Sequence, residues 1–194
     1  MFALQLGAPS RGQTMIRDAN EGDLDAVVAI YNAAIPGRLA TADTEVVSVE
    51  SRRAWFHDRD HRRHPIWVSE RDGQVVAWLS FGKFYGRPAY AATAELSVYV
   101  DPTAQRKGIA TELVDAAVAR AANLGLSTFL GFVFAHNERS ITLCRKFGFE
   151  QWGLLPKVAV LDGIERDLLI LGRRLGGDAA PHKALQTGGA VPRR

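Results

Sequence analysis

The stretch Glu95-Leu-Ser-Val-Tyr-Val-Asp-Pro-Thr-Ala-Gln-Arg-Lys-Gly-Ile-Ala110 joins an alternating, strand-like segment to a basic turn that opens a helix. At a helix N-terminus the first backbone N–H groups are unpaired and lie at the positive end of the helix dipole. Gly108 lets the main chain approach a phosphate without an obstructing Cβ, and Arg106 and Lys107 add positive charge. The stretch therefore predicts a pyrophosphate-binding turn. It has neither P-loop nor Rossmann spacing, so nucleoside triphosphate hydrolysis is not expected.

Hydrophobic periodicity on both sides of this stretch predicts alternating strands and helices. A first helix after residue 18 stops at Pro36, a second runs from Ser48 to the basic stretch near Arg62, and two more cover 109–123 and 138–147. Strands are expected at 14–17, 66–71, 74–81, 93–100, 128–134, 151–161 and 165–171, with a hairpin signal at Asp72-Gly73. This order predicts an α/β domain.

The length and composition indicate one domain, expected at residues 14–174. Residues 1–13 are expected to be a disordered extension and residues 175–194 a disordered tail, because they are rich in Gly, Pro and other breakers of regular structure. No apolar run approaches the roughly 20 residues that span a bilayer, and the first residues do not resemble a secretory signal. With a single cysteine, Cys144, an internal disulfide is impossible. We expect a cytoplasmic protein without a membrane partner.

Basic and metal-binding patterns are weak. The net charge is +3, and the arginine pairs at 52–53, 62–63, 173–174 and 193–194 have no nucleic-acid-binding signature between them, so a nucleic-acid partner is not expected. His57 and His61 lie four residues apart on the predicted second helix, a spacing that can bind zinc. No third ligand accompanies them at a recognisable spacing, so no metal is expected.

The motif Gln105-Arg-Lys-Gly-Ile-Ala110 resembles the Q/R-x-x-G-x-G/A signature of GNAT acetyltransferases, with the strand before it and the helix after it. Residues 84–100, with R-P-A-Y at 87–90 and T-A-E-L-S-V-Y-V at 93–100, resemble the branch that acetylates phosphinothricin and methionine sulfoximine. Further matches lie at 30–33, 51–56, 137 with 140, 146–149 and 167. The resemblance spans roughly residues 15–174.

The resemblance implies the GNAT fold, a mixed central sheet of about seven strands splayed at the cofactor site, with about four helices. It implies acetyl-CoA as co-substrate, a small amine acceptor and a homodimer. A backbone N–H near Val98 is expected to polarise the thioester carbonyl. The implied cofactor contacts are Val98, Val100, Gln105, Arg106, Lys107, Gly108, Ile109, Ala110, Asn137 and Ser140. Asn137 also suits the N-cap of the helix that follows it, and both roles can hold together.

An α-amino group of pKa about 8 is ~90% protonated at pH 7, so acetylation needs a base. Glu95 matches the base proposed for the family, acting directly or through a water, and partial burial would raise its pKa and improve it as a proton acceptor. The alternative is an outward-facing strand carboxylate. Arg87 and Tyr90 match the family's acceptor-binding loop, and a guanidinium suits a carboxylate or phosphinate. The alternative for these two is a solvated arginine and a packed tyrosine, and Trp55 and Phe56 are expected in the core.

Two departures from the family pattern leave questions open. Cys144 stands where many relatives carry Tyr or His, and a tyrosine there is the family's usual candidate acid for the departing thiolate. The alternatives are departure without a protein acid, donation by Cys144, or donation by Tyr99 or water, of which the unassisted or water route is favoured. A buried, inert cysteine is also favoured over a nucleophile paired with His136. The last hairpin, L-D-G-I-E at 161–165, also differs, so phosphinothricin itself is not assured. The alternatives are another amine, such as a protein N-terminus or a polyamine, and a non-catalytic acyl-CoA-binding module.

Overall fold

The computed structural model describes residues 14–176, so the predicted extension at 1–13 and the predicted tail beyond residue 176 lie outside the described residues. The predicted order of elements is confirmed. The strands are β1 (Thr14–Asp18), β2 (Ile66–Arg71), β3 (Gln74–Lys83), β4 (Thr93–Val100), β5 (Thr128–Phe134), β6 (Glu150–Leu161) and β7 (Ile164–Arg174). The α-helices are α1 (Leu24–Ala34), α2 (Val49–His57), α3 (Ile109–Arg120) and α4 (Glu138–Lys146).

Within residues 14–176, the seven strands form one sheet in the order β1-β2-β3-β4-β5-β7-β6. Neighbouring strands are antiparallel except for β4 and β5, which are parallel. The hairpin between β2 and β3 turns at Asp72 and Gly73, whose φ angles of 50° and 77° are those of the turn that an Asp-Gly pair favours. A mixed sheet of seven strands with four helices is the predicted GNAT architecture.

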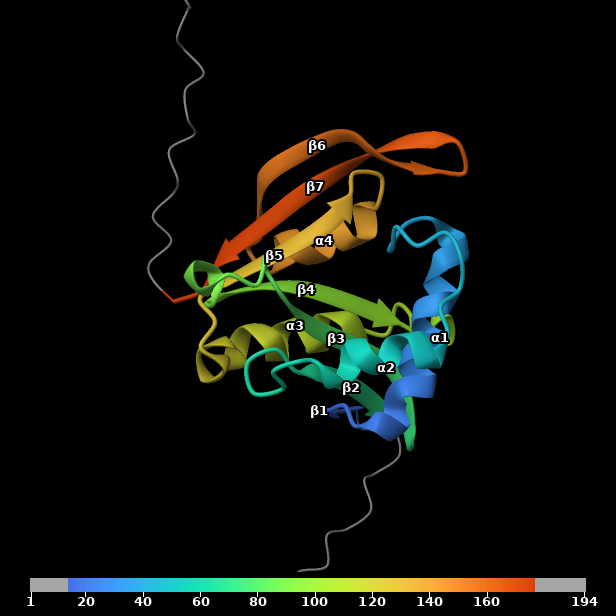
Figure 1. Ribbon diagram of the computed structural model, residues 1–194, viewed down its shortest axis with the longest axis vertical. Coiled ribbons are helices and arrows are strands. Elements are labelled where there is room, and N and C mark those ends of the chain that lie inside the picture. Colours follow the sequence, from blue (N-terminus) through green and yellow to red (C-terminus); the bar gives the residue numbers. More distant parts are fainter. Residues whose placement is uncertain (1–13, 177–194) are drawn as a thin grey trace, which may run out of the picture.

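The sheet opens between β4 and β5. The two strands pair only through Thr93, Ala94 and Glu95 on β4, opposite Thr128, Phe129 and Leu130 on β5. Beyond these pairs β4 continues to Val100 and β5 to Phe134, and the two diverge (Figure 1). The predicted splay is therefore present, and its vertex lies at the end of the short parallel pairing.

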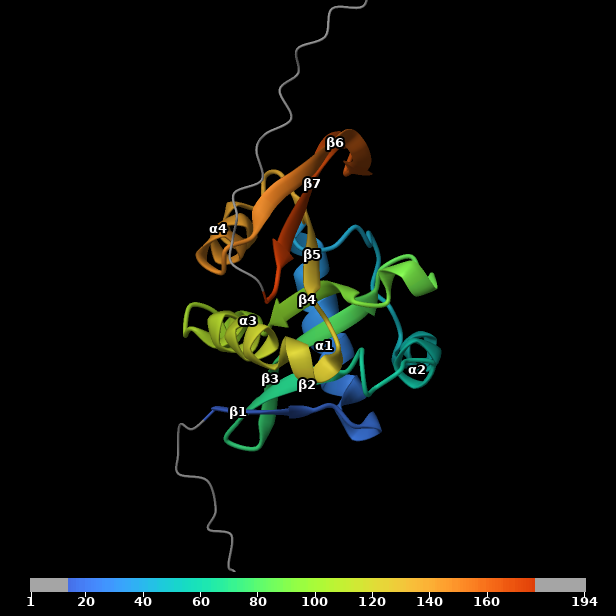
Figure 2. The same ribbon diagram turned by 90° about the vertical axis from the view of Figure 1, so that its left-hand side faces the viewer.

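Helices cover both faces of the sheet, with α1 and α2 on one face and α3 and α4 on the other (Figure 2). Because strand side chains alternate between faces, Val68 and Trp78 pack under α1 and α2, whereas Trp67 and Leu79 belong to the core under α3. None of the helices in the described part of the chain is long and apolar enough to cross a membrane.

Helix α2 begins where the sequence predicts but ends earlier. The Ser48 hydroxyl caps it by accepting a hydrogen bond from the Ser51 N–H (3.1 Å). The helix stops at His57, so the predicted continuation to the basic stretch near Arg62 is wrong. There the chain turns back toward β2, and Arg59 donates hydrogen bonds to the carbonyls of His64 (3.0 Å) and Phe81, contacts that a continued helix would not permit.

Replacing Phe81 with alanine is expected to lower the free energy of unfolding by about 3–5 kcal/mol. The Phe81 side chain is fully buried, and its ring centroid lies 4.8 Å from that of Trp67 and 5.8 Å from that of Phe129, so truncation leaves a cavity. Urea unfolding followed by circular dichroism measures the change. Val46→Ala, at a side chain that is 74% exposed, is the control and should change stability by less than about 0.5 kcal/mol. Equal stability of the two variants would contradict this packing.

Candidate active site

The basic turn stands at the N-terminus of α3. Arg106 and Gly108 have left-handed backbones, with φ of 61° and 84°, and a side chain at position 108 would be strained. Gly108 is the N-cap of α3 and provides no side-chain cap hydrogen bond, so the first N–H groups of the helix are open to a ligand. Gln105, Arg106 and Lys107 are exposed around these groups. The arrangement can hold an anion, as the sequence predicts.

The open edge of β4 leads to this turn. The Ala92 carbonyl accepts hydrogen bonds from the N–H groups of Ser127 (2.9 Å) and Thr128 (3.1 Å), so it points toward β5. Along a strand every second residue turns its peptide groups to the same edge. Val98 and Val100 therefore direct their peptide groups into the splay, where β4 and β5 no longer pair. These are the two strand residues that the sequence analysis assigns to the cofactor.

Glu95 lies at the vertex of the splay. It is the last residue of β4 that pairs with β5, opposite Leu130, and on the other side it faces Gly82 of β3. A Cβ on residue 82 would approach the Glu95 Cβ to 3.5 Å, so the glycine leaves the carboxylate room. The side chain is partly buried, and this burial raises the pKa of the Glu95 carboxyl above its ordinary value. A partly desolvated carboxylate next to the opening is a stronger proton acceptor than one in water.

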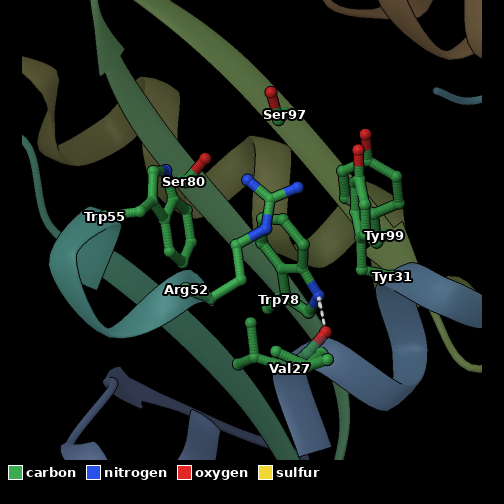
Figure 3. Close-up of a pocket in the computed structure, with 9 residues that line it drawn as sticks. Val27, Tyr31, Arg52, Trp55, Trp78, Ser80, Ser97 and Tyr99 are labelled. Atoms are coloured by element: carbon green, nitrogen blue, oxygen red, sulfur yellow. Dashed lines mark hydrogen bonds between the residues drawn. The ribbon is translucent and has the colours of Figure 1, made fainter. Parts of the chain in front are cut away.

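A cavity of about 170 Å³ lies on the α1 and α2 side of the sheet (Figure 3). Glu95 is not one of its lining residues, but it precedes the lining residue Ser97 by two positions and so shares its face of β4. Its main walls are Tyr31, Arg52, Trp55, Trp78, Ser80, Ser97 and Tyr99. Trp78 stacks on Tyr99 with ring centroids 4.6 Å apart. Tyr31 meets Tyr99 edge to face, with centroids 5.1 Å apart, and Trp55 meets Trp78 in the same way, with centroids 5.9 Å apart. The cavity is small and lined by aromatic rings, which suits a small ligand with a carbon chain.

The predicted acceptor residues do not line this cavity. Arg87 and Tyr90 are exposed on the loop between β3 and β4, where the Tyr90 ring packs against Phe84 at 5.3 Å. Trp55 lines the cavity and also packs against the buried cluster under α1 and α2, whereas Phe56 is buried in the core as expected.

The sequence analysis missed Tyr31, Arg52, Trp78 and Tyr99 as wall residues. Tyr99 could have been found, because it alternates with Glu95 and so shares its face of β4. Tyr31 and Arg52 fall within the segments that match the family, but helical spacing alone does not show which side of a helix meets a cavity.

Asn137 caps α4, which confirms its N-cap interpretation. Its Oδ1 accepts a hydrogen bond from the Ser140 N–H (3.1 Å), and its Nδ2 donates to the Leu39 carbonyl (3.0 Å). The neighbouring His136 Nε2 lies 2.9 Å from the Arg38 carbonyl oxygen, so the start of α4 is tied to the loop after α1. The predicted contacts of Asn137 and Ser140 with a cofactor stay predictions.

His57 and His61, whose spacing in the sequence can bind zinc, lie at the end of α2 and in the loop after it. His57 and His61 are exposed, and both rings pack near Phe56, with centroids 5.4 Å and 5.1 Å away. The His57 Nε2 lies 3.6 Å from a Glu21 oxygen. Among residues 14–176, no group of three His, Cys, Asp or Glu side chains is placed to hold a metal ion.

Cys144 on α4 is mostly buried and lies against β5, where a Cβ on Gly131 would come within 4.0 Å of its Sγ. Burial raises the pKa of the Cys144 thiol to about 11. The thiol is therefore protonated near neutral pH, and only the thiolate is a nucleophile. The structure favours an inert cysteine.

Cys144 is expected to react slowly with iodoacetamide. At pH 8 a thiol of pKa about 11 is about 0.1% ionised, against about a quarter of an ordinary thiol of pKa ~8.5. We expect alkylation, followed by mass spectrometry, to be at least about 100-fold slower than for free cysteine and to quicken about tenfold per pH unit. Protein unfolded in urea is the control and should react at the ordinary rate. A folded-state rate close to that of free cysteine would contradict the burial.

These features together define a site for group transfer. The open edge of β4 and the anion-binding turn of α3 suit an extended cofactor that carries phosphates, and the cavity beyond Glu95 suits an acceptor. Such a site belongs to the acyltransferases with a splayed sheet.

Comparisons with known proteins agree with this class. A profile of the acetyltransferase (GNAT) family matches residues 26–149. YwnH of Bacillus subtilis, provisionally named a phosphinothricin acetyltransferase, is 48% identical over 161 residues, which cover 82% of this chain and 98% of YwnH. The L-methionine sulfoximine/L-methionine sulfone acetyltransferase of Pseudomonas aeruginosa is 34% identical over 157 residues, 80% of this chain and 91% of that protein. The chain belongs to the GNAT family of acetyltransferases.

A solved structure extends the likeness to the fold. The GNAT phosphinothricin acetyltransferase of Sinorhizobium meliloti, crystallised with acetyl-CoA, superposes with a TM-score of 0.80 at 27% sequence identity. The match covers 89% of this chain and 94% of that structure.

Proposed function

We propose that this protein is an acetyl-CoA-dependent N-acetyltransferase that acetylates the amino group of a small amino-acid-like acceptor of the phosphinothricin or methionine sulfoximine type. The observation that carries the proposal is the position of Glu95 at the end of the β4 and β5 pairing, on the face of β4 whose Ser97 and Tyr99 line the aromatic cavity. The relatives named for phosphinothricin and methionine sulfoximine support the class of acceptor.

The open edge of β4 and the start of α3 suit acetyl-CoA, which supplies the acetyl thioester. The open N–H groups at the start of α3 and the left-handed Gly108 suit its pyrophosphate. The peptide groups of Val98 and Val100 suit its extended arm, and the Val98 N–H is the candidate donor to the thioester oxygen. The full set of proposed contacts is Val98, Val100, Gln105, Arg106, Lys107, Gly108, Ile109, Ala110, Asn137 and Ser140.

The base in this reaction is Glu95, which takes a proton from the acceptor ammonium directly or through a water. The neutral amine then attacks the thioester carbon, so that an N–C bond forms, the C–S bond breaks and the thiolate leaves. The nitrogen, now positively charged, gives its second proton to water or to the departing thiolate and becomes the neutral amide. Cys144 is a poor donor to that thiolate, because its pKa of about 11 exceeds the ~8.5 of an ordinary thiol. The Tyr99 hydroxyl donates to the Ala40 carbonyl (3.1 Å), and burial raises the pKa of Tyr99 well above its usual range. Departure without a protein acid, or with water, fits both observations.

The acceptor loop assigned from the resemblance stays part of the proposal. Arg87 and Tyr90 lie outside the cavity wall but on the loop that leads into β4, so they would form the outer part of an acceptor site.

Glu95→Gln is expected to lower turnover at least about tenfold, because the amide cannot accept the proton. The assay is thiol release from acetyl-CoA with phosphinothricin, methionine sulfoximine, methionine sulfone, common amino acids and spermidine. Glu150→Gln, an exposed strand carboxylate, is the control and should keep full activity. Turnover confined to spermidine, or acetyl-CoA binding without turnover on any amine, would contradict the proposed acceptor.

The same variant is expected to melt at a higher temperature than the parent at neutral pH. The folded-state pKa of Glu95 is raised, so its contribution to stability is fully present below the unfolded-state pKa and is lost as the pH rises through the folded-state pKa. Glutamine carries no charge and avoids this loss. The melting temperature, measured at pH 4 and at pH 8, should therefore change less between these two pH values for Glu95→Gln than for the parent.

We also propose that the protein forms a homodimer through β6. This edge strand of the sheet and the start of β7 expose six large apolar side chains: Trp152, Leu154, Leu155, Val158, Val160 and Ile164. An exposed apolar edge strand is prone to pair with another chain, and a contiguous apolar patch indicates a contact surface.

Sedimentation at micromolar concentration is expected to give a dimer of this 21.2 kDa chain. The double substitution Val158→Asp and Val160→Asp should shift it to the monomer, because two charges would be buried without partners. Val46→Asp, at an apolar side chain exposed elsewhere, is the control and should leave the dimer intact. A monomeric parent protein would contradict the proposal.

We further propose a cytoplasmic location without nucleic-acid or membrane partners. The single cysteine, with its protonated thiol, agrees with a reducing compartment. Of the arginine pairs, Arg53 is paired with Glu21 and Glu50, and Arg173 donates to the Phe147 carbonyl, which supports structural roles for these two cations.

A further inference from the structure

Arg52 brings a positive charge into the aromatic cavity. It projects from α2, and its guanidinium carbon lies 4.8 Å from the centre of the Tyr31 ring and 5.9 Å from that of Trp55. Its Nη2 donates to Asp43 Oδ2 (3.1 Å), and the same carboxylate oxygen accepts a hydrogen bond from the Tyr31 hydroxyl (2.6 Å). The ring and the carboxylate hold the guanidinium in one orientation.

Most of the hydrogen-bonding capacity of Arg52 is unused. A guanidinium has five N–H donors, and within residues 14–176 its one hydrogen-bond partner is Asp43. In Figure 3 its terminal nitrogens point toward the part of the cavity wall that carries Ser80 and Ser97. These two serines pair across β3 and β4 and add two hydroxyl groups to the same wall. A cation in an oriented fork, beside two hydroxyls, is the donor set for a carboxylate or phosphinate.

The distance to Glu95 suits an amino-acid acceptor. Ser97 follows Glu95 by two residues on the same face of β4, so the two Cα atoms lie about 7 Å apart. An amino acid whose amine reaches Glu95 can therefore direct an acidic group toward Ser97 and Arg52. Its carbon chain would then lie among the aromatic rings of the cavity.

Building on the proposed function, we propose that Arg52 binds the oxyanion of the acceptor, a carboxylate or a phosphinate, and that the surrounding rings pack against its carbon chain. Asp43 is a positioning residue that holds the guanidinium over Tyr31. Arg52 thereby provides the anion-binding group inside the cavity, and Arg87, which is exposed outside it, keeps its proposed place in the outer part of the acceptor site. The site selects anionic amino acids over amines without an acidic group.

The test is acceptor affinity in Arg52→Gln and Arg52→Lys. Trp55 and Trp78 line the cavity, so quenching of tryptophan fluorescence in the presence of coenzyme A gives the acceptor Kd, and thiol release gives KM and kcat. Arg52→Gln is expected to raise Kd and KM for phosphinothricin at least about tenfold, with Arg52→Lys between it and the parent. The KM for acetyl-CoA should not change. Arg53→Gln, on the same helix and bonded to Glu50 (2.8 Å), is the matched control and should behave as the parent.

Three acceptors identify which oxyanion is bound. Methionine sulfone carries only the α-carboxylate, phosphinothricin carries a phosphinate as well, and phosphinothricin α-carboxamide carries only the phosphinate. If Arg52→Gln weakens methionine sulfone and spares the carboxamide, the α-carboxylate is bound. If it weakens the carboxamide and spares methionine sulfone, the phosphinate is bound.

Two results would overturn the inference. One is an unchanged Kd for all three acceptors in Arg52→Gln. The other is an equal loss for every amine, spermidine included, together with a lower melting temperature, which would indicate a structural role. Asp43→Asn retains the guanidinium and should give a smaller rise in Kd on the same acceptors. If the parent protein binds the acceptors in an Arg52-dependent way but does not acetylate them, the proposed acetyl transfer is refuted and the inference about Arg52 stands. If the parent acetylates them and the Arg52 variants bind them equally well, the proposed function stands and the inference is refuted.

Discussion

The short parallel pairing of Thr93–Glu95 with residues 128–130 joins the two halves of the sheet. Within the half that contains β1 to β4, and within the half that contains β5 to β7, all neighbouring strands are antiparallel. If β4 and β5 paired along their whole lengths, β4 would have no open edge for a ligand. If they did not pair, the halves would have no common core. Ala94 and Phe129, both fully buried, lie at this junction. A parallel pair also requires a crossover, and here the crossover is α3, so the same constraint brings the basic turn to the end of β4.

In the proposed reaction one strand, β4, would contact both ligands, because its groups point in different directions. The peptide groups of Val98 and Val100 lie in the plane of the sheet and face the splay. The side chains of Ser97 and Tyr99 line the cavity under α1 and α2, and Glu95 lies on the same face of β4. The proposed reaction would therefore bring its reacting atoms together near the vertex, where Glu95 lies.

Burial has opposite consequences for the two acidic groups near the splay. It raises the pKa of the Glu95 carboxyl, which makes a carboxylate at the opening a better base. It raises the pKa of the Cys144 thiol to about 11, which removes the nucleophile and the efficient proton donor that a cysteine could have been. Desolvation is the shared cause. The carboxyl has an ordinary pKa below neutral pH, so a raised pKa makes its carboxylate a stronger base, whereas the thiol has an ordinary pKa above neutral pH, so a raised pKa keeps it protonated.

The sequence by itself determined the features that depend on near neighbours. The order of strands and helices, the Asp72-Gly73 hairpin, the caps at Ser48 and Asn137 and the glycine turn before α3 follow from periodicity and local hydrogen bonds, and all are present. The family motif around Glu95 likewise indicated the chemistry. Only the tertiary structure decided where α2 ends, because Arg59 bonds to the distant Phe81 carbonyl. It also decided which arginine meets the cavity. Arg52 and Arg87 both lie near aromatic residues in the chain, but the walls of the cavity come from α1, α2, β3 and β4, and no local pattern records how those four elements pack.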